Sequence, residues 1–251
     1  MGIRFLLAGI LLSLLVIARS GKKEFAIPSP QIRTSAVMGF VLLGFGLGNV
    51  AVSEEHVPSG VVALIIAALP LWIAIFRTIA RDTPSWRGWI GVLVGFAGVA
   101  LLMKPGSITS VSGEDSRTVV FSMFMVLLGN IGWALGTYLA PRFPLPKNAL
   151  VFTAIEMIAG GISLTIAGFL RGESFGDFTD GTALSWFWFW YLVVFGSIIA
   201  YTAYQYLVAN APVALTATYA YVNPITAVTL GAENAEPNMF PAPNRYFPAG
   251  P

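Results

Sequence analysis

Glu156 is the only carboxylate that lies well inside a long apolar stretch of this 251-residue chain. Burying an ionised carboxylate in such surroundings is costly unless the charge is neutralised or paired. Two roles fit Glu156 equally well. It is either a site that takes up a proton or a substrate amine, or a protonated carboxyl that is hydrogen-bonded to a neighbouring helix.

Two prolines, Pro70 and Pro224, lie inside other apolar stretches. A proline removes one backbone hydrogen bond and frees a carbonyl, which a cavity can use. Prolines also occur in membrane helices for packing reasons alone, but their related positions favour a hinge or a site. Tyr219, Tyr221 and Asn223 precede Pro224, so this stretch is the best candidate for lining a pathway. Tyr219 and Asn223 are one turn apart and could instead bond to a packed neighbour. Weaker candidates are Tyr201, Tyr204, Gln205, Trp133 and Asn49.

Eight hydrophobic stretches carry these residues, and a lipid core about 30 Å thick needs about 20 apolar residues per helix. Hydrophobic residues make up 56% of the chain and charged residues only 10%, and the mean hydropathy is +0.76. We therefore predict an all-α polytopic membrane protein with about eight transmembrane helices. The expected helices cover residues 2–18, 35–53, 57–76, 85–103, 118–140, 148–170, 184–209 and 211–231.

The composition also restricts the kinds of partner that the protein can bind. The net charge of +2 is too small and too dispersed for a nucleic-acid-binding protein. The chain has no cysteine and one histidine, His56, which excludes thiolate and multi-histidine metal sites. We expect membrane lipid and a small molecule as partners, no metal or cofactor, and a chain that is compatible with a homo-oligomer.

The basic residues predict how the helices are oriented. The first stretch could be a signal peptide, but Arg19, Lys22 and Lys23 follow it, which favours a retained helix whose far end is cytoplasmic. Alternate loops divide the Lys and Arg residues nine to five, so we expect both ends of the eight-helix bundle outside the cytoplasm. The nine are Arg19, Lys22, Lys23, Arg33, Arg77, Arg81, Arg87, Arg142 and Lys147; the five are Arg4, Lys104, Arg117, Arg171 and Arg245.

An internal repeat relates the two halves. The segment from Val57 to Pro70 aligns without gaps on the segment from Ala211 to Pro224, with Pro58 on Pro212 and Ala63 on Ala217. Residues 7–9 likewise fall on residues 158–160. In both matches the second segment lies five helices after the first. Because five is odd, the second copy must be inverted in the membrane. Secondary transporters have such repeats, with the substrate site near the midplane between the copies.

The repeat predicts a five-plus-five fold from which the first and last helices are absent. The expected units are residues 1–104 for the first copy, 118–231 for the second, and a proline-rich non-membrane tail over 232–251. The fifth expected helix has no partner before residue 1, and the fourth has none after residue 231.

The chain resembles the EamA-domain transporters of the drug/metabolite transporter superfamily, and most closely their bacterial inner-membrane exporters. The resemblance covers about residues 3–231, and the matching stretches are residues 4–9, 57–60 leading to Pro70, 91–99, 132–134 and 218–224. It implies ten helices in two inverted repeats and export of small metabolites, often amino acids. The departure is the absence of the family's first helix and the replacement of its last helix by the tail.

The predicted function is therefore a secondary transporter that exports small metabolites, amino acids or drugs across a bacterial inner membrane by alternating access. One alternative is a non-functional transporter fragment. Another is a membrane-embedded enzyme, since residues 172–176 match the nucleophile-elbow pattern around Ser174. That motif works on a strand-to-helix turn with histidine and acid partners, so we expect a transporter rather than an enzyme.

Overall fold

The computed structural model describes residues 1–102, 116–174, 176 and 181–222, and the regular secondary structure of this part of the chain is all helical, without strands. Six of its helices are long and apolar enough to cross a membrane. The predicted all-α polytopic architecture is thus confirmed. The six candidate spans are Gly2–Ser20, Ser29–Ser53, Val61–Ile79, Ser116–Arg142, Ala149–Leu170 and Ala183–Asn210.

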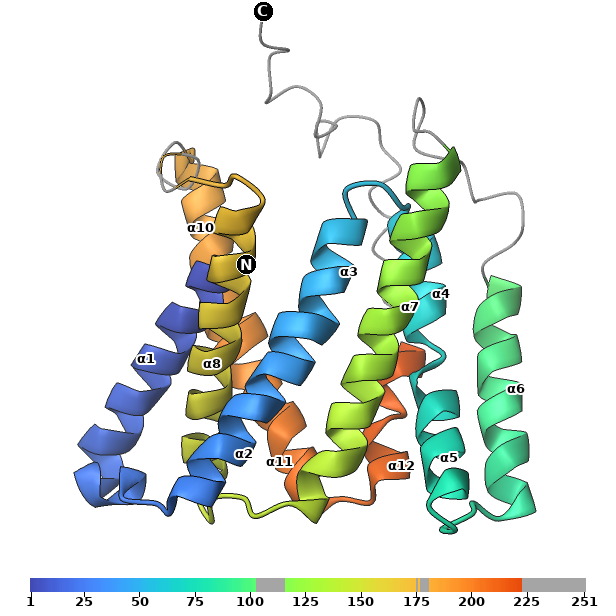
Figure 1. Ribbon diagram of the computed structural model, residues 1–251, viewed down its shortest axis with the longest axis horizontal. Coiled ribbons are helices and arrows are strands. Elements are labelled where there is room, and N and C mark those ends of the chain that lie inside the picture. The colour runs from blue at the N-terminus through green and yellow to red at the C-terminus, as the bar shows by residue number, and fades with distance from the viewer. Residues whose placement is uncertain (103–115, 175, 177–180, 223–251) are drawn as a thin grey trace, which may run out of the picture.

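The helices stand roughly side by side in one bundle (Figure 1). In chain order they are α1 (Gly2–Ser20), the 3-10 turn η1 (Lys22–Phe25), α2 (Ser29–Gly39), η2 (Phe40–Leu47), α3 (Gly48–Ser53), α4 (Ser59–Ile66), α5 (Leu69–Ile79), α6 (Trp86–Leu102), α7 (Ser116–Leu139), the 3-10 turn η3 (Ala140–Arg142), α8 (Ala149–Leu170), α10 (Ala183–Tyr191), η4 (Leu192–Tyr201), α11 (Thr202–Asn210) and α12 (Val213–Thr216).

Each of the eight predicted stretches is helical where the structure describes it. The fourth is the 17-residue α6, and the eighth continues past α12 as an apolar helix over Val213–Val222. Asn223, Pro224 and the predicted tail lie outside the described residues.

The third spanning helix is broken into α4 and α5 at Ala67 and Ala68. Pro70 explains the break, because it has no N–H for the carbonyl of Ile66 and its ring disfavours a continuous helix. The N-terminal ends of the matched segments also agree. Pro58 precedes α4 with φ −55° and ψ 136°, and Pro212 precedes α12 with φ −55° and ψ 131°.

Two stretches of π-helix, η2 and η4, interrupt the second and seventh spanning helices. Leu7 matches Ile158 and Val57 matches Ala211, which are separations of 151 and 154 positions. The same separations carry residues 40–47 onto 191–201, where η4 lies. Well under 1% of residues in proteins are in π-helices, so this coincidence supports the proposed relation between the two halves. π-helical turns occur frequently at functional sites.

Close packing between helices depends on glycine. Helix α1 lies along α8 (Figure 1), with Phe5, Ala8 and Leu12 buried against Ala154 and Met157. On another face of α8, Gly39 packs directly on the backbone of Glu156, where an added Cβ would come within 2.8 Å of the Cα atom. Glu156 is therefore held at one of the tightest helix contacts of the bundle.

Candidate functional site

Glu156 is completely buried in the middle of α8 and is hydrogen-bonded to the seventh spanning helix through Tyr201. The Tyr201 hydroxyl donates a hydrogen bond to Oε2 of Glu156 at 3.4 Å. The same hydroxyl accepts a hydrogen bond from Nε2 of Gln205 at 2.6 Å. Gln205 is also completely buried. The three side chains form a hydrogen-bonded row between α8, the end of η4 and α11.

Aromatic side chains surround this row. The Trp133 ring of α7 lies 6.3 Å from the Tyr201 ring and 5.4 Å from the Tyr204 ring. Tyr219 packs on Tyr204 edge-to-face at 5.4 Å, and Phe5 of α1 packs on Tyr201 at 6.2 Å. We call this set the central cluster. It comprises Glu156, Tyr201, Gln205, Trp133, Tyr204, Tyr219 and Phe5.

Several polar atoms of the central cluster lack a hydrogen-bond partner among the described residues. They are Oε1 of Glu156, Oε1 of Gln205 and Nε1 of Trp133, all of them buried. Buried polar groups are normally hydrogen-bonded, and an unsatisfied one costs about 1–3 kcal/mol. The cluster therefore has two acceptors and one donor that a bound polar molecule could satisfy.

A cavity of about 220 Å³ lies against the cluster and is lined by Trp133 and Tyr219. Its lining also includes Ile66, whose carbonyl has no Pro70 N–H to bond. At the same break in the helix, the buried Asn130 side chain of α7 donates a hydrogen bond to the Ile65 carbonyl at 2.7 Å. The cavity is otherwise apolar, with Gly46, Leu47, Val50 and Gly129 completing its lining.

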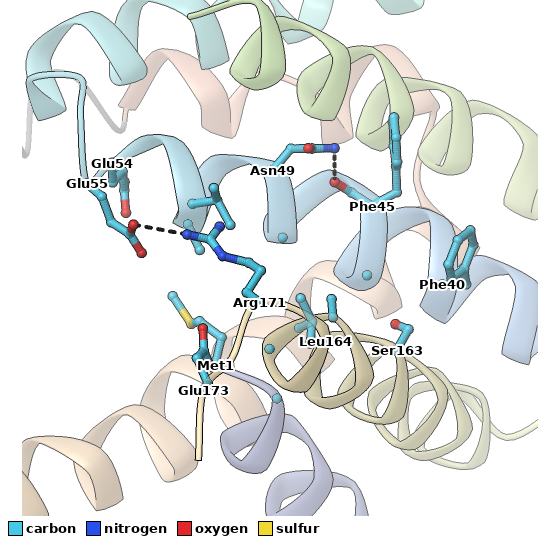
Figure 2. A pocket seen from close by; sticks show the side chains of 17 residues that line it. Met1, Phe40, Phe45, Asn49, Glu54, Glu55, Ser163, Leu164, Arg171 and Glu173 are labelled. Carbon is cyan, nitrogen blue, oxygen red and sulfur yellow. Dashed lines mark hydrogen bonds and ion pairs between the residues drawn. The ribbon is translucent and has the colours of Figure 1, made fainter. Parts of the chain in front are cut away.

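A larger groove of about 490 Å³ opens at the end of the bundle where α3 and α8 finish (Figure 2). Arg171, just after α8, donates to Glu55 at 3.2 Å across its mouth. Partial desolvation raises the pKa of the neighbouring Glu54. Asn49 lines this groove, and its amide donates to the Phe45 carbonyl of its own helical turn at 2.9 Å. The groove is thus separate from the central cluster.

The predicted site residues are distributed unevenly. Glu156, Gln205, Trp133, Tyr204 and Tyr219 come together in the central cluster, and Pro70 is buried at the helix break beside the cavity. Two candidates lie elsewhere.

Tyr221 donates to the Val92 carbonyl at 3.1 Å and so joins the last described helix to α6, whereas Asn49 faces the groove. Asn223 and Pro224 lie outside the described residues.

Two polar residues in α7 were missed in the sequence analysis. Asn130 and Thr137 are both buried, and the Thr137 hydroxyl is hydrogen-bonded to that of Tyr204. A polar side chain inside an apolar stretch is the signal that would have found Asn130. Thr137 is harder to find from the sequence, because a threonine inside a helix can satisfy its hydroxyl on its own helix. Thr137 also does so, donating to the Trp133 carbonyl at 2.7 Å.

The nucleophile-elbow pattern has a different context from the one that its chemistry needs. It begins at Gly172, in a turn after helix α8, with φ +90°. No strand precedes it in the described part of the chain. Ser174 is exposed in the segment that follows.

These apolar helices, which bury a carboxylate, an amide and packed aromatic rings beside a cavity, form a polytopic membrane protein. The sequence profile of the EamA-like transporter family matches residues 1–104 and 120–232, and the chain belongs to this family.

Proteins with similar sequences are also named as transporters. The chain is 38% identical over 232 residues to the uncharacterized inner membrane transporter YedA of Escherichia coli K12, which covers 92% of this chain and 71% of YedA. It is 24% identical to the uncharacterized transporter YvbV of Bacillus subtilis, over 90% of this chain and 71% of YvbV. It is 25% identical to the uncharacterized transporter sll0355 of Synechocystis, again over 90% of this chain and 71% of that protein. No solved structure matches the chain.

Proposed function

We propose that this protein exports small metabolites across the bacterial inner membrane by alternating access, coupled to protonation of Glu156. Transport is inferred from membership of the EamA-like transporter family. The inner-membrane location is inferred from the similarity to the inner membrane transporter YedA. The observation that carries the coupling proposal is the state of the Glu156 carboxyl. One of its oxygens is hydrogen-bonded to Tyr201, while the other is buried without a partner among the described residues.

The side chains around Glu156 include few groups that could neutralise the charge of its carboxylate. The titratable side chains facing it are Tyr201 and, one turn further along the helix, Tyr204. From α1 and η2 it meets apolar neighbours, with Phe5 and Leu43 in the same buried cluster as Met157. The ion pairs found among the described residues involve Glu55 and Asp82 instead. A proton or a cationic ligand is therefore the natural counterpart of this carboxylate.

Irregular helices near the cluster support the alternating-access part of the proposal. η4 ends at Tyr201, and η2 packs against α7 and α8. The break between α4 and α5 lies beside the cavity. Such interruptions leave backbone groups that can exchange partners, so they suit helices that must change their relative positions.

Transport by the purified protein in liposomes tests this proposal. The chain is reconstituted with a panel of radiolabelled amino acids and amines, and uptake is measured with and without an imposed pH gradient. We expect gradient-driven accumulation that Glu156→Gln abolishes while expression and reconstitution stay unchanged. Glu173→Gln, an exposed carboxylate beyond the same helix, is the matched control and should retain accumulation. Unaltered pH dependence in Glu156→Gln would reduce Glu156 to a structural role.

A further inference from the structure

We infer that the central cluster and its cavity bind a monocationic amine with a compact apolar body, in preference to the amino acid of the same side chain. This inference rests on the proposed transport function and names its substrate class. It starts from the polar atoms of the cluster that have no hydrogen-bond partner among the described residues, and from whether each of them is a donor or an acceptor.

Hydrogen-bond acceptors outnumber donors at the cluster. Among the described residues, Oε1 of Glu156 and Oε1 of Gln205 are both buried without a partner, and the one donor of the cluster in the same state is Nε1 of Trp133. An ammonium group carries donors and no acceptor, so it satisfies both oxygens and neutralises the carboxylate at the same time. A neutral alcohol would bond to the same oxygens but would leave the charge uncompensated.

The aromatic rings fit the same ligand. Trp133 and Phe5 both pack on the Tyr201 ring, with ring centroids about 6 Å apart, and the Tyr201 hydroxyl bonds to the carboxylate. The faces of such rings attract cations, most strongly for tryptophan, and the attraction grows where water is excluded. A cation at Glu156 would thus meet the negative charge of the carboxylate next to this group of aromatic rings.

A substrate carboxylate, in contrast, finds no basic side chain beside Glu156 among the described residues. The Arg4 guanidinium reaches the edge of the cluster, 4.4 Å from the centroid of the Phe5 ring, but it lines a separate cavity with Thr165 and Phe189. The arginines of the described spanning helices stand near helix ends, as Arg4 does in α1 and Arg77 does in α5. Arg77 is moreover paired with Asp82. The Asn130 amide, which also lines the cavity, is bonded to the Ile65 carbonyl. The α-carboxylate of an amino acid would therefore be buried without a counter-charge, which disfavours it.

The cavity sets the size of the ligand's body. Its volume of about 220 Å³ and its apolar lining between Trp133 and Tyr219 suit one phenyl ring or a short branched alkyl group. Trp133 lines the cavity and packs on the Tyr201 ring, so a turn of this one side chain would open a path from the cavity toward Glu156. The body would occupy the cavity and the ammonium group would lie against Glu156.

Equilibrium binding to the purified chain in lipid nanodiscs tests the inference without requiring transport. The probes are radiolabelled phenethylammonium, phenylalanine, 2-phenylethanol and methylammonium at pH 7, with empty nanodiscs subtracted. Phenethylammonium shares its ring with phenylalanine and 2-phenylethanol, and its charge with methylammonium. We expect it to bind at least about tenfold more tightly than each of the other three.

Variants assign this preference to the cluster. Glu156→Gln should remove the advantage of phenethylammonium over 2-phenylethanol, and Glu156→Asp, which keeps the charge, should retain most of it. Tyr201→Phe provides a second measurement if Glu156→Gln fails to fold, and should weaken amine binding because it frees the carboxylate to reorient. Equal or tighter binding of phenylalanine, or a preference that survives Glu156→Gln, overturns the inference. Amine-selective binding without transport would overturn the proposed function instead.

Discussion

The Tyr201 hydroxyl stands between Glu156 and Gln205, donating to the carboxylate at 3.4 Å and accepting from the amide at 2.6 Å. The direction of both bonds is fixed by the amide, because its N–H can only donate. Tyr201 must therefore direct its single proton to Glu156. This row fixes one carboxylate oxygen and leaves the other available, and it links α8 to the π-helical end of η4.

Replacement of Tyr201 by phenylalanine should destabilise the protein by about 1–3 kcal/mol, because it leaves a buried carboxylate oxygen and a buried amide without partners. Unfolding of the purified protein in mixed detergent micelles measures the change. Tyr206→Phe, at an exposed tyrosine on α11, is the control and should have no effect. A double-mutant cycle with Glu156→Gln should show coupling between the two positions, whereas additive effects would contradict the bond.

The Asn130 amide stabilises the broken helix at Pro70. Asn130→Leu should cost about 1 kcal/mol, since it removes one of the two hydrogen bonds to the Ile65 carbonyl and leaves only that from the Ala68 N–H at 3.1 Å. Asn49→Leu is the matched control, because Asn49 bonds to the Phe45 carbonyl of its own helix at an exposed position. We expect the same unfolding measurement to separate the two variants clearly. Equal effects would show that the Asn130 bond adds no stability.

Gly39 lies directly on the backbone of Glu156, so even a methyl group must push α2 away from α8. Gly39→Ala should therefore lower stability by about 1–3 kcal/mol and weaken transport or binding at Glu156. Gly91→Ala on α6 is the control, since a Cβ there meets no described atom within 4 Å. Binding of phenethylammonium in nanodiscs and thermal unfolding together measure the two effects. Normal behaviour of Gly39→Ala would indicate that the helices can separate freely.

The sequence predicted the helices well because a long apolar stretch in a membrane has few folds available to it. It also identified Glu156, since a lone carboxylate stands out in such a stretch. It did not predict η2 and η4, because their residues are as apolar as those of ordinary helices. Nor could it show that Tyr221 bonds to Val92 rather than facing the cluster, which depends on how α6 packs.

Asp82 follows α5 and accepts two hydrogen bonds from Arg77, at 2.9 and 3.2 Å. This pairing lowers the pKa of the exposed Asp82 carboxyl below its ordinary value. A lowered pKa means that the pair adds stability above the unfolded pKa of about 4 and loses it as the pH falls through the folded pKa. We expect Asp82→Asn to reduce the loss of stability on acidification below about pH 4, measured by unfolding at pH 7 and at low pH. An unchanged acid response would mean that the pair contributes nothing.

Arg81 and Gly172 occupy the same position after two different helices. After α5, the Asp82 N–H donates to the Arg77 carbonyl and the Arg81 N–H to that of Thr78. After α8, the Glu173 N–H likewise donates to Gly168 and the Gly172 N–H to Phe169. Both ends are Schellman motifs, which need a left-handed residue, and φ is +61° at Arg81 and +90° at Gly172.

Only glycine adopts this conformation without cost, and an L-residue there loses about 1–2 kcal/mol. Arg81→Gly should therefore stabilise the protein, by at most about 1 kcal/mol, because glycine also gains entropy in the unfolded chain. Gly172→Ala should destabilise it by about 1 kcal/mol or more. Arg81→Ala, which keeps a Cβ and removes the charge, separates the backbone effect from electrostatics and should leave stability nearly unchanged. Opposite shifts in the midpoint of thermal unfolding for the two glycine substitutions are the expected result, and a loss of stability in Arg81→Gly would show that the arginine side chain outweighs the strain.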